Sequence, residues 1–91
     1  MRGFLVKRAV HSGDNWKPRF LVLQGTSLEY FEAEQSVSAK GIFQLSADCS
    51  VHECRRQLTF KLVTPHKVLD ARASSAEDMD AWIMALRGAI E

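Results

Sequence analysis

Several polar side chains in the first half of the chain occupy positions where a hydrophobic face is expected. Residues two apart in a β-strand share one face of the sheet, and in three expected strands that face carries Leu5, Leu21, Leu23 and Leu28. The same parity is found for four polar residues: Lys7, Lys17, Arg19 and Tyr30. Arg binds phosphate with two parallel hydrogen bonds, Lys acts as a point charge, and a Tyr hydroxyl adds a donor. The pattern therefore indicates a site for a phosphorylated anion.

These four residues should converge, because each lies at the end of its strand nearest the turn-rich segment 10–15. Burying unpaired cations is costly, so they need carboxylates or an anion nearby. Glu29 has the parity opposite to Tyr30, which leaves Asp14 in the adjacent loop as the one plausible internal partner. A solvated arrangement is the alternative, since Lys and Arg can extend from a strand end into water.

Catalytic and metal chemistry have little support in the sequence. The three histidines fall in a loop, a strand and a turn, and they form no set of acid, base and nucleophile. Cys49 and Cys54 enclose His52, but zinc sites usually require a second, distant pair of ligands. We therefore expect no enzyme activity, no metal and no cofactor. Reduced thiols and a cytoplasmic location are favoured.

The elements that must position these residues are short. Turn residues recur every ~8–12 residues, which is typical of a small antiparallel β-structure. The expected strands cover residues 3–9, 16–23, 27–32, 41–46, 49–54, 58–64 and 67–73. Pro18 cannot donate a ladder hydrogen bond, so that end of its strand should be an edge, a bulge or the strand start.

The period changes near the C-terminus, where one face of an amphipathic helix over 76–89 is formed by Met79, Trp82, Ile83, Leu86 and Ile90. Ser75 followed by Asp78, or Ser74 followed by Glu77, is a capping-box start. Trp82 should anchor the helix on the sheet. Seven strands and one helix indicate an α+β, mainly β, fold in which the helix covers a small sheet.

Composition sets the remaining limits. A chain of 91 residues forms one domain, which we expect to span 1–91. It is 46% hydrophobic and 25% charged, near the average for globular proteins, and no apolar run is long enough to span a membrane. The net charge of +1 argues against nucleic acid as a partner, so any anion site must be local.

The order and spacing of several segments resemble the pleckstrin homology (PH) domain family over essentially the whole chain. The segments are Gly3–Lys7, Trp16–Leu23, Leu28–Phe31, Gly41–Leu45 and the helix with Trp82. The resemblance implies a bent seven-stranded antiparallel barrel capped by one C-terminal α-helix. It also implies a membrane-recruitment module, located in the cytoplasm and recruited peripherally to the plasma membrane or endomembranes.

The resemblance further implies roles for individual residues. Lys7 and Arg19 would clamp the inositol 3-phosphate, with Lys17 as the basic partner of Arg19, and Tyr30 would donate to the 4-phosphate. Lys40 matches a basic position that approaches the same headgroup. The secondary candidates are Arg8, His66 and Lys67.

Other segments resemble tandem PH-domain adaptor proteins that prefer phosphatidylinositol 3,4-bisphosphate. Asp14 and Asn15 replace the basic loop residues of many trisphosphate binders, and the chain has no added hairpin between the sixth and seventh strands. Both features favour the 3,4-bisphosphate over the 3,4,5-trisphosphate. The alternatives are a Golgi type that binds phosphatidylinositol 4-phosphate, and a domain that binds a protein partner and little lipid.

Overall fold

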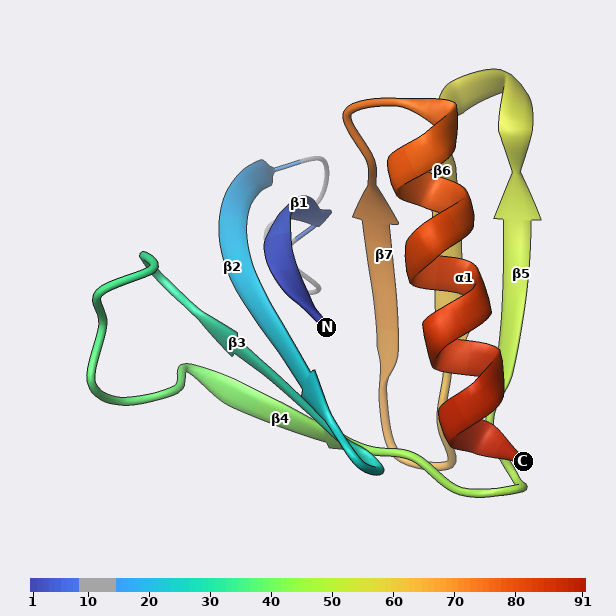
Figure 1. Ribbon diagram of the computed structural model, residues 1–91, viewed down its shortest axis with the longest axis horizontal. Coiled ribbons are helices and arrows are strands. Elements are labelled where there is room, and N and C mark those ends of the chain that lie inside the picture. The colour runs from blue at the N-terminus through green and yellow to red at the C-terminus, as the bar shows by residue number, and fades with distance from the viewer. Residues whose placement is uncertain (9–14) are drawn as a thin grey trace.

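Seven antiparallel strands and one C-terminal helix make up the molecule, as the computed structural model in Figure 1 shows. The structure describes residues 1–8 and 15–91. The strands are β1 (Arg2–Arg8), β2 (Trp16–Gln24), β3 (Ser27–Phe31), β4 (Gly41–Gln44), β5 (Ser50–Cys54), β6 (Thr59–Val63) and β7 (Val68–Arg72). The helix is α1 (Ala76–Ile90). The predicted fold class is confirmed, and the strand bounds differ from the predicted ones by one or two residues.

All seven strands belong to one sheet with the order β4-β3-β2-β1-β7-β6-β5. The sheet bends around the core, and α1 lies against the half formed by β5, β6 and β7 (Figure 1). We call the face that carries the core the inner face and the opposite face the outer face. No helix in the described part of the chain is long and apolar enough to cross a membrane.

Pro18 lies at the exposed start of β2, as its missing N–H requires. It pairs with Val6 of β1, whereas the ladder to β3 begins at the pair Phe20–Phe31. The ladders therefore give β2 a strand neighbour on one side only at Pro18, and the predicted edge position is confirmed.

The segment before β6 differs from the prediction. Residues Arg55–Gln57 form a short 3-10 helix, and Leu58, which was expected to begin the strand, has a left-handed backbone with φ 56°. The Leu58 N–H donates to the Arg55 carbonyl, and the Leu58 carbonyl accepts from Ala73. These two hydrogen bonds, the first local and the second tertiary, offset the cost of positive φ in a residue with a side chain.

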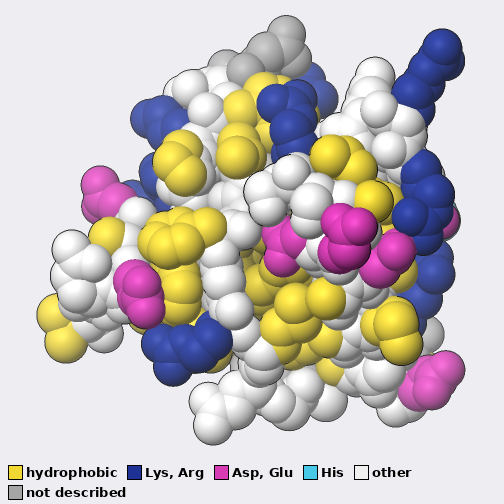
Figure 2. Space-filling model, turned by 45° about the horizontal axis from the view of Figure 1, so that its top comes forward, with side chains coloured by type: hydrophobic (Ala, Val, Ile, Leu, Met, Phe, Trp, Pro, Cys, Tyr) yellow, Lys and Arg dark blue, Asp and Glu magenta, His cyan; other side chains and the backbone are white. Residues whose placement is uncertain are grey.

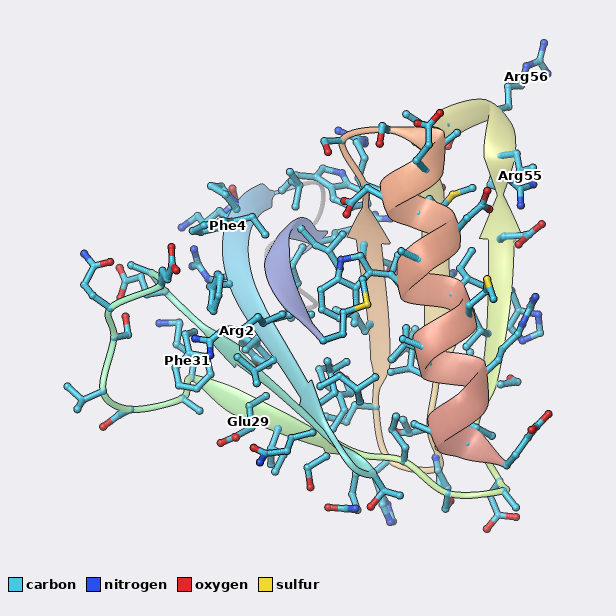
Figure 3. All side chains as sticks on the ribbon, in the orientation of Figure 1. Arg2, Phe4, Glu29, Phe31, Arg55 and Arg56 are labelled. Carbon is cyan, nitrogen blue, oxygen red and sulfur yellow. The ribbon has the colours of Figure 1, made fainter. Side chains whose placement is uncertain are left out.

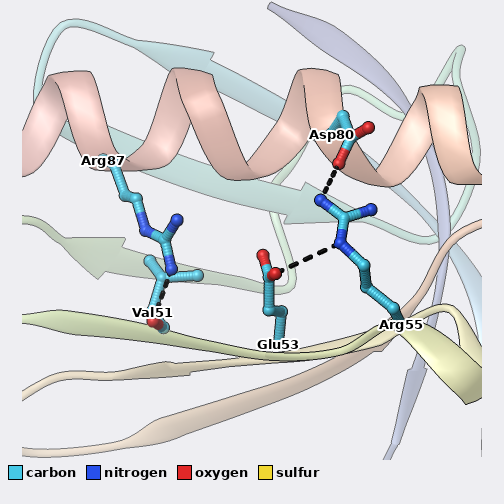
Figure 4. Close-up of polar contacts among 5 residues, drawn as sticks. All are labelled: Val51, Glu53, Arg55, Asp80 and Arg87. Carbon is cyan, nitrogen blue, oxygen red and sulfur yellow. Dashed lines mark hydrogen bonds and ion pairs between the residues drawn. The ribbon is translucent and has the colours of Figure 1, made fainter.

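Ser75 caps the helix as predicted, because its hydroxyl accepts a hydrogen bond from the Asp78 N–H at 3.0 Å. Further polar contacts hold α1 on β5 (Figure 4). Arg87 donates to the Val51 carbonyl at 3.2 Å, and Arg55 bridges Glu53 and Asp80 at 3.3 and 2.5 Å. These contacts keep the helix over β5, β6 and β7, the half of the sheet that lies far from the predicted anion site.

The core lies between the bent sheet and the helix, and Trp82 is its largest side chain, with 1% of its surface exposed. It packs with leucines from both halves of the sheet, including Leu5, Leu21, Leu28, Leu62 and Leu69. The helix thus supplies hydrophobic surface that the small sheet lacks, and the predicted anchoring role of Trp82 is confirmed.

Candidate functional site: a cluster of cations on the inner face

Two lysines face each other across the first two strands. Lys7 of β1 is the register partner of Lys17 of β2, and on its other side Lys7 pairs with Ala71 of β7. Lys7 is half-buried and Lys17 is exposed. Like charges placed directly opposite one another destabilise a sheet, so this pair has a cost in the free protein.

Arg19 lies on the same face, two residues further along β2 and opposite Leu5. The residue is half-buried, and its guanidinium donates to the carbonyl of Pro18 at 2.8 Å in an exposed hydrogen bond. The remaining guanidinium donors can still bind a ligand, since Arg carries five N–H groups. The predicted convergence of Lys7, Lys17 and Arg19 is therefore present in the structure.

Tyr30 of β3 lies beside these three cations. It pairs with Leu21 of β2 and with Gly41 of β4, and the Lys7 ammonium lies 4.6 Å from the centroid of its ring. The ring covers Gly41 so closely that an added Cβ would lie 2.5 Å from the Tyr30 hydroxyl oxygen. Glycine at position 41 thus leaves the space in which the Tyr30 ring rests.

Replacing Gly41 with Ala should consequently move Tyr30. The ring must shift away from the new methyl group, which disturbs its contact with Lys7, and crowding of this kind typically costs ~1–3 kcal/mol of folding stability. Chemical denaturation would measure the stability loss, and Tyr30 ring NMR shifts would report the movement. Unchanged Tyr30 shifts in a folded Gly41→Ala protein would contradict the proposed contact.

Lys67, a secondary candidate in the sequence, joins the cluster from the turn between β6 and β7. Its ammonium lies 4.6 Å from the centroid of Phe43 and donates to the carbonyl of Ile42 on β4. The Phe43 ring in turn lies 5.9 Å from the Tyr30 ring. The sequence analysis did not predict that Phe43 contacts Lys67 and Tyr30. Phe43 lies two residues from Gly41 and therefore shares its face of the sheet, which was the signal that could have indicated the contact.

The environment of Lys7 lowers the pKa of its ammonium below the ordinary value of 10.5. Burial is the main cause, followed by the positive charges of Arg19 and Lys67, and the Asp70 carboxylate acts in the opposite direction. Cations from β1, β2 and the β6–β7 turn therefore act on one another. An anion that binds among them would relieve this repulsion.

The other candidates lie in different places. Lys40 is exposed, and its backbone N–H donates to the Tyr30 carbonyl at 2.8 Å, which keeps it beside the cluster. His66 is exposed in the same turn as Lys67. Arg8 pairs with Trp16 on the outer face and lies on the opposite side of the sheet from Lys7. We call Lys7, Lys17, Arg19, Tyr30, Lys40 and Lys67 the basic site.

The described carboxylates that form ion pairs do so with cations outside the basic site. Within residues 1–8 and 15–91, ion pairs join Arg55 to Glu53 and Asp80, and Lys61 to Asp70. None of these involves a residue of the basic site. Asp14, the internal partner expected from the sequence, lies outside the described residues.

A cavity of about 380 Å³ is found away from the basic site, and its lining includes Arg8, Trp16, His52, Lys61 and Asp70. Both acidic and basic side chains line this cavity, and Lys61 pairs with Asp70 at 3.6 Å. Phosphate is recognised through charged donors, and more cations gather at the basic site than in this cavity.

Comparison with known proteins agrees with this architecture. A family model described as "PH domain" matches residues 1–91. The chain belongs to the PH domain family. PH domains are non-catalytic binding modules that commonly bind phosphoinositides and are commonly recruited to the periphery of membranes.

Curated relatives are larger proteins. This PH domain is 28% identical to pleckstrin homology domain-containing family A member 2 of Mus musculus over 98% of the chain and 23% of that protein. It is 30% identical to human pleckstrin over 98% of the chain and 27% of pleckstrin. It thus spans about a quarter of the length of these two proteins.

Solved PH domains share the fold. The C-terminal PH domain of pleckstrin, crystallised in complex with D-myo-Ins(1,2,3,4,5)P5, superimposes with a TM-score of 0.88 at 23% identity. The match covers 100% of this chain and 97% of that one. A solution structure of a pleckstrin homology domain gives 0.84 at 26% identity, over 98% and 82% of the two chains.

Proposed function

We propose that this PH domain binds the phosphorylated inositol headgroup of a membrane lipid at the basic site and thereby recruits its parent protein to the membrane surface. The observation that carries the proposal is the opposed pair Lys7–Lys17 with Arg19 beside it, on a face where no described carboxylate forms an ion pair with them. A polyanion converts the repulsion among these groups into charge-assisted hydrogen bonds.

We assign the contacts as follows. Lys7 and Arg19 clamp the 3-phosphate with support from Lys17, and Tyr30 donates to the 4-phosphate. Lys40 approaches from the β3–β4 connection. Lys67 adds a positive charge to the site, and its hydrogen bond to Ile42 also ties the β6–β7 turn to β4. Arg8 and His66 are left out of the clamp, since Arg8 projects from the outer face and His66 is exposed in the turn.

The preferred headgroup under this proposal is the 3,4-bisphosphate. The β6–β7 connection is a tight turn in which Thr64 and Lys67 exchange hydrogen bonds through the Thr64 hydroxyl. It offers no extended hairpin to reach a 5-phosphate, and the exposed Asn15 adds no charge. Both features support the bisphosphate over the 3,4,5-trisphosphate.

Titration with soluble headgroups, followed by amide NMR shifts, tests the proposal. The series carries phosphates at positions 4, at 3,4, at 4,5 and at 3,4,5. Saturable shifts at Lys7, Arg19, Tyr30 and Lys40, strongest for the 3,4-headgroup, are expected. Strongest binding of the 4-phosphate would favour the Golgi-type alternative. Flat spectra with every headgroup would overturn lipid binding and favour a protein partner.

Headgroup affinity should fall as pH rises through the lowered pKa of Lys7. A bound phosphate favours the charged ammonium and raises its pKa, so binding takes up a proton once Lys7 has begun to titrate. The fall should begin below pH 10.5, the ordinary lysine value. Isothermal titration calorimetry over alkaline pH measures it. The Lys7→Arg variant should lose this part of the pH dependence, because guanidinium stays charged there.

A further inference from the structure

A second cluster of aromatic side chains lies outside the main core, on the outer face. Phe4, Phe20 and Phe31 are register partners across β1, β2 and β3. Phe20 is only 4% exposed although it points away from the core, because Phe4 packs edge-on at 5.0 Å and the Arg2 guanidinium lies 5.3 Å from its ring centroid. Phe4 itself is 51% exposed. This apolar row therefore presents hydrophobic surface to the outside.

The row next to it carries opposite charges on β1 and β3, and it continues to Ile42 of β4, which is 44% exposed. Arg2, Val22 and Glu29 are register partners across the same three strands. Neither Arg2 nor Glu29 forms an ion pair within the described part of the chain. Arg2, Phe4, Phe31 and Glu29 lie on the side of β2 and β3 away from α1 (Figure 3), and hydrophobic side chains reach the surface on the left of Figure 2.

The two rows have a common symmetry about β2. Neighbouring strands are about 4.8 Å apart, so Arg2 and Glu29 lie at equal distances on either side of Val22, and Phe4 and Phe31 on either side of Phe20. A two-fold axis along β2 would place Arg2 of one copy against Glu29 of the other, twice. It would also place Phe4 against Phe31. The patch is thus complementary to itself, as an isologous interface requires.

We propose that this outer face of β1, β2 and β3 is a self-association surface, and that its partner is a second copy of this domain in which Arg2 pairs with Glu29. Exposure is concentrated at Phe4, with Phe31 and Val22 half-buried, so the buried area falls below that of a permanent dimer. The association is accordingly weak in dilute solution and grows with local concentration.

The geometry has a consequence for membrane binding, and this consequence rests on the proposed function. A two-fold axis along β2 leaves the direction of β2 unchanged. Lys17 and Arg19 lie near the start of β2, so both basic sites lie at the same end of the pair, although the inner faces that carry them point in opposite directions. One membrane can then engage both sites, and two linked contacts bind more tightly than one.

Sedimentation velocity at rising protein concentration, without lipid, tests the interface. The wild-type domain should self-associate in the millimolar range. Arg2→Glu and Glu29→Arg should each weaken association by roughly tenfold, because each reversal makes two contacts per dimer repulsive. The double variant with both reversals should restore it, as should an equimolar mixture of the two single variants.

The matched control is Arg56→Glu, which makes the same charge change at an exposed residue far from the patch (Figure 3). It should leave self-association unchanged. A wild type that stays monomeric throughout, a control as weak as Arg2→Glu, or a mixture that fails to associate would each overturn the interface.

A lipid experiment separates this inference from the proposed function. Arg2→Glu should bind soluble headgroup like the wild type and bind vesicles containing the same lipid less tightly. If the wild type does not bind the headgroup but does self-associate, the proposed function would be wrong and the proposed interface would still hold. Equal vesicle binding by wild type and Arg2→Glu would overturn the paired engagement of the membrane.

Discussion

Arg19→Ala is expected to lower affinity for the soluble 3,4-bisphosphate headgroup by roughly 100-fold or more. The loss follows because a guanidinium donates two charge-assisted hydrogen bonds to one phosphate, each worth about 1.5–3 kcal/mol. Isothermal titration calorimetry measures it directly. The fold should survive, since Arg19 is half-buried beside other cations and forms no ion pair with a described carboxylate.

The pKa of Lys7 in Arg19→Ala and the headgroup affinity of a control variant test the same assignment. Removal of the Arg19 charge should raise the pKa of Lys7 toward its ordinary value, because Arg19 is one cause of the lowering. The control Arg56→Ala removes an exposed guanidinium from the 3-10 helix and should leave affinity unchanged. Wild-type affinity in a folded Arg19→Ala domain would place the headgroup somewhere other than the basic site.

Trp82→Ala should cost ~3–5 kcal/mol of unfolding free energy, a large share of the 5–15 kcal/mol typical of a domain. Trp82 is 1% exposed and joins α1 to both halves of the sheet, so its removal leaves a large cavity. Urea denaturation would measure the change.

Met84 provides the control on the same helix, because its side chain is 75% exposed. Met84→Ala should change stability by less than about 0.5 kcal/mol. If the two variants lost equal stability, burial of the Trp82 side chain would not explain the loss and the anchoring role would be wrong, because Ala itself favours the helix.

The strands and the helix could be predicted closely because the information is local. A period of two residues shows which side chains share a face, and a period near 3.6 places Met79, Trp82, Ile83 and Leu86 on one side of α1. The cap at Ser75 is also local, since its hydroxyl bonds an N–H three residues away. The prediction for Leu58 was wrong because Leu58 ends the short 3-10 helix with a left-handed backbone, and its carbonyl accepts from a distant residue, Ala73.

The same parity groups Lys7, Lys17, Arg19 and Tyr30 from the sequence alone, but it does not identify their partners across the sheet. The direct opposition of Lys7 and Lys17 depends on the register between strands. The approach of Lys67 to Phe43 depends on how the sheet bends, since the two residues lie far apart in the chain.

The periodicities along the chain, two for the strands and about 3.6 for the helix, therefore determined the secondary structure and grouped the residues of the proposed anion site. The tertiary structure alone decided which cations repel one another, and that Phe4, Phe20 and Phe31 form one row across three strands. The physical reason is that register and sheet curvature minimise the free energy of the whole core, whereas alternation reflects only which side of each strand is buried.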